Sequence, residues 1–183
     1  MGRTLTLAEI ADAQAEGGEA AVVRLLGGAP ALILRTEPWS PKSPVAEGSW
    51  SATQKLSLEA TASDGVLDRP LSVIANKACP VIPLAKSERN PFVGVITLGR
   101  APNNDVCLVS SLVSNIHAFF KDVPGRSWAL QDNTSRNGTF VNNERLEPRV
   151  DRYLTRMDEV RFGDVAGMFV DPETVASLCL LVR

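Results

Sequence analysis

Three short polar clusters in the second half of the chain carry side chains that donate hydrogen bonds. The first contains Arg100, the second contains Ser114 and Asn115, and the third contains Arg136 and Asn137. Arginine offers a planar fork of N–H donors, and hydroxyl and amide groups add single donors. Donors of these types that converge suit an anion with several oxygen atoms, such as a phosphate group.

The clusters also contain glycine and histidine residues at fixed positions. In order along the chain they are Gly99-Arg100, Ser114-x-x-His117 and Asn137-Gly138. This order and spacing resembles the signature of the forkhead-associated (FHA) domain, a phosphothreonine-binding module. Supporting matches are Asn104-Asp105 and the closing Val160-Arg161-Phe162-Gly163. The resemblance covers roughly residues 80–171 and leaves residues 1–70 outside it.

The resemblance implies a binding role for four of these side chains. Arg100 is expected to pair with the phosphate, and Ser114 to donate its hydroxyl to another phosphate oxygen. Asn115 is expected to contact the phosphate or the peptide, and Asn137 to hydrogen-bond the peptide main chain. Taken alone, Arg100 is equally consistent with a surface arginine paired to Asp105, and Asn137-Gly138 with a simple hairpin turn.

The resemblance implies a structural role for Gly99, His117 and Gly138. His117 is expected to brace the Ser114 loop from below, and the two glycines to permit the loop geometry, Gly138 with positive φ. One position departs from the family pattern, because Arg136 stands where the family commonly has threonine. A second arginine either strengthens phosphate binding or, through its bulk, alters peptide selection or fills the site. How phosphothreonine is told from phosphoserine therefore stays open.

The leading hypothesis is therefore a non-enzymatic module that recognises phosphothreonine peptides in Ser/Thr kinase signalling. Its partners are expected to be a threonine-phosphorylated protein and an upstream Ser/Thr protein kinase. The alternative is an FHA-fold interaction or assembly module that does not depend on phosphorylation. Thr61, with Asp64 three residues later, is a candidate for phosphorylation that would occupy the site in cis.

A hydrolytic enzyme built on Ser114 and His117 is disfavoured. Their spacing on a loop that enters a strand does not present a nucleophile to a base, and no orienting carboxylate is evident. The sequence also lacks a Gly-x-Ser-x-Gly motif and a phosphate-binding P-loop.

The amino-acid composition argues against two further classes of function, metal binding and nucleic-acid binding. His117 is the only histidine among 183 residues, which excludes zinc motifs with two histidines, and no metal or cofactor is expected. A net charge of −2 argues against non-specific binding to nucleic acid.

The cysteines and the apolar stretches indicate where in the cell the protein is expected. Cys79, Cys107 and Cys179 form no Cys-x-x-Cys pair and are odd in number, which favours reduced thiols and a cytoplasmic location. The most apolar stretch, residues 20–34, is interrupted by Arg24 and Pro30, so no membrane span and no membrane partner are expected.

Short apolar runs separated by turn residues fill the second half of the chain. The runs predicted as strands are Val81–Leu84, Val93–Leu98, Val106–Leu108, Ala118–Asp122, Trp128–Gln131, Thr139–Val141, Glu159–Phe162 and Met168–Val170. This pattern predicts a mainly β protein with an FHA-like antiparallel β-sandwich. Asp171-Pro172-Glu173 then predicts a C-terminal helix over residues 172–182.

The first part of the chain reads differently. Thr6 and Glu9 form a possible capping box for a helix that ends at Gly17-Gly18, followed by a short helix over Glu19–Leu26 and a strand over Ala31–Leu34. We therefore divide the chain into an N-terminal helical and extended segment (1–35), a Pro- and Ser-rich linker or docking segment (36–75), and a sandwich with a terminal helix (76–183). Within the linker, Trp39 and Trp50 are expected to contact the neighbouring domain or a partner.

Overall fold

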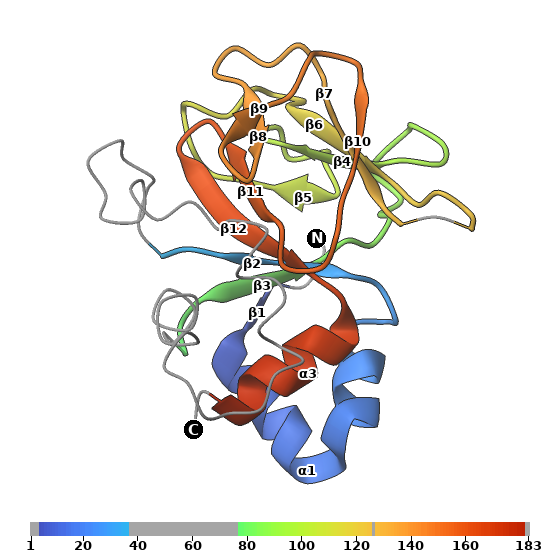
Figure 1. Ribbon diagram of the computed structural model, residues 1–183, viewed down its shortest axis with the longest axis vertical. Coiled ribbons are helices and arrows are strands. Elements are labelled where there is room, and N and C mark those ends of the chain that lie inside the picture. Colours follow the sequence, from blue (N-terminus) through green and yellow to red (C-terminus); the bar gives the residue numbers. More distant parts are fainter. Residues whose placement is uncertain (1–3, 37–76, 126, 182–183) are drawn as a thin grey trace.

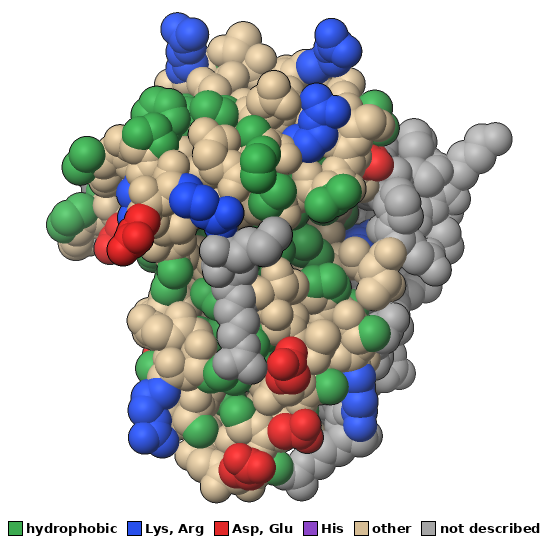
Figure 2. Space-filling model, turned by 180° about the vertical axis from the view of Figure 1, so that it is seen from behind, with side chains coloured by type: hydrophobic (Ala, Val, Ile, Leu, Met, Phe, Trp, Pro, Cys, Tyr) green, Lys and Arg blue, Asp and Glu red, His purple; other side chains and the backbone are tan. Residues whose placement is uncertain are grey.

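The computed structural model describes residues 4–36, 77–125 and 127–181. Trp39, Trp50, Thr61 and nearly all of the predicted linker lie outside the described residues. The described part forms a sandwich of two β-sheets with two helices packed beside one of them (Figure 1). On the face turned away from that view, hydrophobic, basic and acidic side chains all reach the surface (Figure 2).

The strands build one seven-stranded and one five-stranded sheet. The seven-stranded sheet has the order β1-β3-β2-β12-β11-β8-β9, with bounds Leu5–Thr6, Pro80–Pro83, Ala31–Leu34, Val165–Val170, Glu159–Phe162, Thr139–Val141 and Glu144–Arg145. The five-stranded sheet has the order β10-β7-β6-β4-β5, with bounds Asp151–Tyr153, Ala129–Asp132, Ala118–Lys121, Ile96–Gly99 and Val106–Cys107. The predicted β-sandwich is thus confirmed. One pair departs from the antiparallel pattern, because β4 and β5 run parallel with Leu98 opposite Val106.

Alternation along the strands builds a core between the sheets. Phe120 and Leu130 of the five-stranded sheet and Leu32, Val160 and Phe162 of the seven-stranded sheet belong to one buried cluster. Burying a side chain of this size contributes roughly 1.5–3 kcal/mol. Because this core fixes both sheets, the loops at their ends start from defined positions.

The part of the seven-stranded sheet formed by β1, β3, β2 and β12 is buried on its other face as well. Ala31 and Ile33 of β2 belong to a second buried cluster with residues of the two helices, whereas Leu32 and Leu34 belong to the sandwich core. The two clusters account for the apolar sequence of β2, all four residues of which are buried. β2 lies inside the sheet, between β12 and β3, so the N-terminal part of the chain supplies an interior strand of the sandwich.

Helix α1 (Leu7–Leu25) begins with the predicted capping box. The Glu9 N–H donates to Thr6 Oγ1 (3.2 Å), and the Thr6 N–H donates to Glu9 Oε2 (2.8 Å). Gly18 leaves the helical conformation with φ 64° and ψ −163°, which kinks α1 at the predicted Gly17-Gly18 break. The two predicted helices are therefore two halves of one kinked element.

Helix α3 (Pro172–Leu181) confirms the predicted C-terminal helix. The Thr174 N–H donates to Asp171 Oδ1 (2.7 Å), so Asp171 caps the helix. Val175 and Leu178 pack with α1 in the second cluster. No helix in the described ranges has the length and apolar character that crossing a bilayer requires. Cys79, Cys107 and Cys179 are free thiols, as expected.

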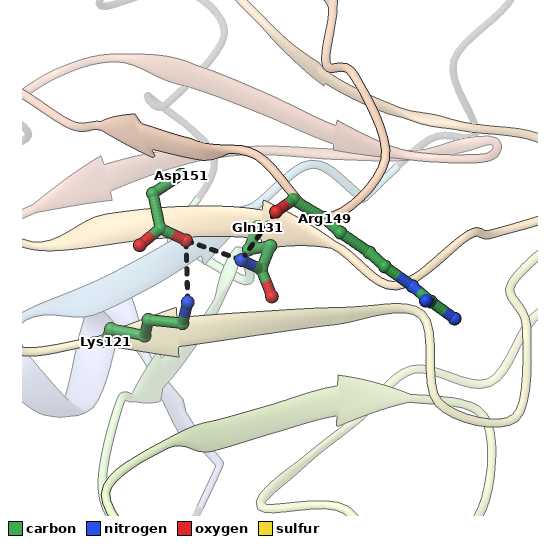
Figure 3. A network of polar contacts seen from close by, with 4 residues as sticks. All are labelled: Lys121, Gln131, Arg149 and Asp151. Carbon is green, nitrogen blue, oxygen red and sulfur yellow. Dashed lines mark hydrogen bonds and ion pairs between the residues drawn. The ribbon is translucent and has the colours of Figure 1, made fainter.

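The outer face of the five-stranded sheet carries a polar network that joins three strands (Figure 3). Asp151 Oδ1 of β10 accepts from Lys121 Nζ of β6 (2.6 Å) and from Gln131 Nε2 of β7 (2.7 Å). Gln131 Nε2 also donates to the carbonyl oxygen of Arg149 (3.1 Å). These contacts secure the edge strand β10, although an exposed ion pair contributes at most about 1 kcal/mol.

A buried carboxylate, Asp105, ties β4 to the loop that precedes it. Its Oδ1 accepts from the Ser87 N–H (2.6 Å), and its Oδ2 accepts from the Thr97 N–H (2.8 Å) and from Asn90 Nδ2. Burial alone would raise the pKa of Asp105, but the N–H donors of Thr97 and Ser87 outweigh it, so the pKa lies below its ordinary value. The ionised form is therefore the one that the fold requires.

We predict that Asp105→Asn lowers the free energy of unfolding by about 2–3 kcal/mol at pH 7, because an amide –NH₂ would face N–H donors. Urea unfolding measures this loss, and Asp122→Asn, at an exposed position, is the matched control with a change below about 0.5 kcal/mol. Because the folded pKa is depressed, the Asp105 contribution is present above the unfolded pKa of about 3.9 and is lost as the pH falls through the folded value. Equal stability of Asp105→Asn and wild type at pH 7 would contradict this role.

Candidate functional site

The register of the five-stranded sheet brings the three predicted polar clusters to one end of it. Leu98 near the end of β4 lies opposite Ala118 at the start of β6, and Ala118 lies opposite Asp132 at the end of β7. The loop after β4, the loop before β6 and the loop after β7 therefore leave the sheet side by side. These loops contain Arg100, the pair Ser114 and Asn115, and the pair Arg136 and Asn137, respectively.

Ser114 connects the other two loops through both of its oxygen atoms. Its carbonyl oxygen accepts from the Arg100 N–H (2.9 Å), and its hydroxyl oxygen accepts from the Arg136 N–H (3.1 Å). The main chains of the two arginines thus lie within one hydrogen bond of the same residue. Both arginine side chains are exposed, and Ser114 is half-buried.

Arg100 and Asn115 contact each other at the surface. Arg100 Nη2 donates to Asn115 Oδ1 (3.3 Å), and both side chains are exposed. The interpretation of Arg100 as a partner of Asp105 is wrong. Both carboxylate oxygens of Asp105 instead accept hydrogen bonds from Ser87, Asn90 and Thr97.

Asn137 is held by the loop that contains Ser114. Its Nδ2 donates to the carbonyl oxygen of Leu112 (2.7 Å), which leaves the side chain half-buried. Gly138 has φ 83°, which confirms the predicted positive φ. The two-residue hairpin turn with positive φ at both positions lies further on, at Asn142 (φ 49°) and Asn143 (φ 68°) between β8 and β9.

The buried ring of His117 joins two of the three loops. Its Nδ1 accepts from the Ser114 N–H (3.0 Å), and its Nε2 contacts the carbonyl oxygen of Gly138 (3.2 Å). Because an amide N–H only donates and a carbonyl only accepts, these partners assign the ring proton to Nε2. The ring is thus neutral, and it packs against Phe162 in a T-shaped contact with 5.8 Å between the ring centroids.

This arrangement separates His117 from the chemistry of Ser114. The contact between the two residues runs through the Ser114 N–H, whereas the Ser114 hydroxyl oxygen accepts from Arg136. The imidazole therefore does not lie where it would take a proton from the hydroxyl, as a serine nucleophile requires. The observed geometry has the form of a brace, which is the role that the resemblance implies for His117.

Gly99 is required by the close approach of the first two loops. A Cβ at this position would lie 2.3 Å from the carbonyl oxygen of Asn115. That oxygen also accepts from the Ala101 N–H (3.1 Å) and from Asn104 Nδ2 (2.7 Å). Any larger residue would push the loop with Asn115 away from the loop with Arg100.

Two buried polar residues that shape the loops were not predicted as part of the site. Asn104 Nδ2 donates to Ala101 and Asn115 carbonyl oxygens, and so links two loops. Asp132 Oδ1 accepts from the hydroxyls of Ser135 (2.5 Å) and Thr139 (2.6 Å), which orders the loop that contains Arg136 and Asn137. The Asn104-Asp105 match drew attention to the first residue without indicating its contacts, and no pattern in the sequence indicates those of Asp132.

We predict that the stability of the protein falls as the pH drops from 7 to 5.5, because of His117. Burial lowers the pKa of His117 below 6.5, although the Gly138 carbonyl and the charge of Asp132 oppose this shift. The unfolded chain therefore takes up the proton first, and the free energy of unfolding decreases below about pH 6.5, by up to about 1.4 kcal/mol per pH unit, until the folded pKa is reached.

Thermal or urea unfolding between pH 5.5 and 7.5 measures this slope, and the chain has no second histidine to contribute to it. His117→Gln is the control, because a glutamine amide can accept from Ser114 and donate to Gly138 without titrating. A slope near pH 6 that is the same in His117→Gln and in wild type would refute the assignment.

Known proteins share sequence with part of this chain. The E3 ubiquitin-protein ligase rnf8 of Danio rerio is 38% identical over 72 residues, which are 37% of this chain and 15% of that protein. The ABC transporter ATP-binding/permease protein Rv1747 of Mycobacterium tuberculosis is 36% identical over 78 residues, which are 43% of this chain and 9% of that protein. The chain thus spans a small part of the length of these relatives.

Solved structures of FHA domains also match part of this chain. The N-terminal FHA domain of Rad53p from S. cerevisiae, in complex with a phosphothreonine peptide, matches with 22% identity and a TM-score of 0.44, over 54% of this chain and 89% of that chain. A structure from a study of phosphothreonine-dependent FHA domain interactions matches with 27% identity and a TM-score of 0.39, over 42% of this chain and 76% of that chain.

The family model of the FHA domain matches residues 96–163. This range begins with β4 and ends at Gly163, directly after β11, and includes all three loops described above. Residues 96–163 of this chain are therefore assigned to the FHA domain family.

Proposed function

We propose that this chain recognises threonine-phosphorylated peptides through Arg100, Ser114, Asn115, Arg136 and Asn137, without catalysing a reaction. The observation that carries the proposal is the position of Ser114 between the two arginines, whose main-chain N–H groups bond its carbonyl and its hydroxyl oxygen. The side chains of both arginines are exposed and begin from main-chain positions that contact Ser114. Donors gathered in this way suit a tetrahedral anion with several oxygens.

Hydrogen-bonding capacity remains at this place for a ligand. The Ser114 hydroxyl uses its oxygen to accept from Arg136, which leaves its own hydrogen to donate. Arginine has five N–H donors, and the contact with Asn115 Oδ1 uses one of those of Arg100. A phosphate group with about −1.5 to −2 charges and three acceptor oxygens complements these donors.

The expected strength of binding follows from the number of charge-assisted bonds. Each contributes about 1.5–3 kcal/mol, and two or three of them, less the cost of ordering a peptide, give an affinity on the order of micromolar. An unphosphorylated threonine leaves Arg100 and Ser114 without these bonds. Discrimination between the two forms of the peptide therefore comes from the same donors that provide the affinity.

The cellular setting is part of the proposal. Because Ser/Thr protein kinases produce phosphothreonine, we place such a kinase upstream and a threonine-phosphorylated protein as the direct partner. The free thiols of Cys79, Cys107 and Cys179 fit the reducing cytoplasm, which is the compartment we propose.

We predict that a phosphothreonine peptide library binds with micromolar affinity, that its unphosphorylated counterpart does not, and that Arg100→Ala weakens the binding at least about tenfold. Fluorescence polarisation with labelled libraries measures all three. Arg24→Ala is the matched control, because Arg24 is an exposed arginine on α1, which packs with α3 and the seven-stranded sheet, away from the three loops.

Two outcomes would overturn the proposal. Equal binding of the two libraries to wild type would favour the alternative, an interaction module that does not depend on phosphorylation. Binding that Arg100→Ala leaves unchanged would show that the phosphate is held elsewhere. A phosphoserine library, measured in parallel, tests how Arg136 affects the choice between the two phosphorylated residues.

A further inference from the structure

A third exposed arginine borders the three loops. Arg145 belongs to the edge strand β9, and its guanidinium group lies directly against Gly138. A Cβ at Gly138 would lie 2.8 Å from Arg145 Nε and 3.1 Å from Arg145 Cζ. Gly138 follows Asn137, the residue for which contact with a peptide main chain is proposed. A cation therefore stands at the edge of the proposed site that no sequence motif indicated.

Arg145 is held there by an aromatic ring. Phe140 of β8 lies opposite Arg145 of β9 and, on its other side, opposite Arg161 of β11. Arg145 Cζ is 5.9 Å from the centroid of the Phe140 ring, and Arg161 Cζ is 3.5 Å from it. Arg161 is buried, and its Nη1 donates to the Gly163 carbonyl oxygen (2.9 Å). Arg145 itself is exposed, so its guanidinium group is accessible from the solvent.

Positive and negative side chains both lie near the Phe140 ring. Glu159 Oε1 lies 3.3 Å from Arg35 Nη2, and the positive charges of Arg35 and Arg161 counteract the rise in the Glu159 pKa that burial causes. Burial lowers the pKa of Arg161, the negative charge of Glu159 counteracts this, and the positive charge of Arg145 lowers the pKa further, so the guanidinium groups of Arg145 and Arg161 repel each other. Glu144, next to Arg145 in the chain, pairs instead with Arg152 (3.2 Å).

Two exposed arginines thus lie on either side of Asn137-Gly138. The exposed Arg136 precedes Asn137 in the chain, and the guanidinium group of Arg145 covers Gly138. A bound anion would relieve the repulsion between Arg145 and Arg161 and would add charge-assisted hydrogen bonds. A single phosphate held by Arg100 and Ser114 does not account for these further cations.

We propose that Arg145, supported by Arg136, forms a second anion subsite, which selects phosphothreonine peptides that carry a second anionic side chain. The proposal rests on the function proposed above. The chemistry of the subsite is that of an exposed guanidinium group, which accepts the carboxylate of Asp or Glu and a second phosphate alike. Specificity for acidic or doubly phosphorylated targets would then be a property of this subsite, while Arg100 and Ser114 provide the dependence on phosphothreonine.

The test measures the affinity of four proteins for three phosphothreonine peptide libraries of equal length. The proteins are wild type, Arg145→Gln, Arg145→Lys and Arg100→Ala. The first library has neutral flanking residues, the second has Asp and Glu among them, and the third has one additional phosphoserine. At 0.15 M salt we expect wild type to prefer the second and third libraries to the first by roughly tenfold, the gain of about one charge-assisted bond.

Arg145→Gln is expected to reduce this preference to about twofold, while its binding of the neutral library stays within about twofold of wild type. Arg145→Lys is expected to keep part of the preference, since lysine retains the charge but not the fork of N–H donors. Arg24→Ala controls for the change in net charge, and a thermal melt of each variant controls for folding. The difference between the second and third libraries distinguishes a carboxylate from a phosphate as the second anion.

An undiminished preference in Arg145→Gln would overturn the subsite. Equal weakening of all three libraries by Arg145→Gln would also overturn it, because Arg145 would then contribute to the shape of the phosphothreonine site itself. Failure of the proposed function has a different signature, in which Arg100→Ala binds the neutral library as well as wild type does.

Discussion

Two hydrogen bonds of the buried His117 ring, one at each nitrogen, set the distance between the loop that contains Ser114 and the loop that contains Asn137. Both partners are main-chain groups, so the ring fixes backbone positions rather than the orientation of side chains. The position of Ser114 in turn fixes the main chains of Arg100 and Arg136. A polar ring in the core is favourable only while both nitrogens have partners, and this condition makes the three loops one unit.

The sandwich turns this local unit into a stable surface. Phe162, whose ring makes a T-shaped contact with the His117 ring, belongs to the core between the sheets, so the loops of the site are anchored to that core. Asn104 and Asp132 add buried polar contacts at the ends of the loops, where the backbone leaves the ladders of the sheet. The exposed side chains therefore project from loops that need little ordering when a ligand arrives, which lowers the entropic cost of binding.

Local signals in the sequence predicted local structure well. The capping box at Thr6, the break at Gly18 and the positive φ of Gly138 depend on residues close together in the chain, and the structure confirms them. Each predicted strand is present, with β4 beginning at Ile96 rather than at Val93. The strands β9 and β10 were missed because all their residues are exposed and provide no apolar alternation.

Contacts between residues that lie far apart in the chain could not be predicted from the sequence. The motifs placed Arg100, Ser114, Asn115, Arg136 and Asn137 in three clusters, and the structure brings those clusters to one end of a sheet, while their roles in binding stay proposals. The contact of Arg145 with Gly138 depends on the hairpin between β8 and β9, and that of Asn104 with Asn115 on the packing of two loops. Neither leaves a periodic or spaced pattern along the chain.

The order of strands in the seven-stranded sheet has a consequence for how the molecule is made. β2 comes from residues 31–34, yet one of its two neighbours is β12, which is synthesised more than a hundred residues later. On the ribosome, β2 and α1 emerge early and cannot complete their pairing until the C-terminal strand follows. The family match ends at residue 163, before β12 begins, so a chain that stops there would leave one edge of β11 unpaired, of the kind that templates aggregation. The sheet that supports the site is therefore completed last, when β12 pairs with β11 and β2.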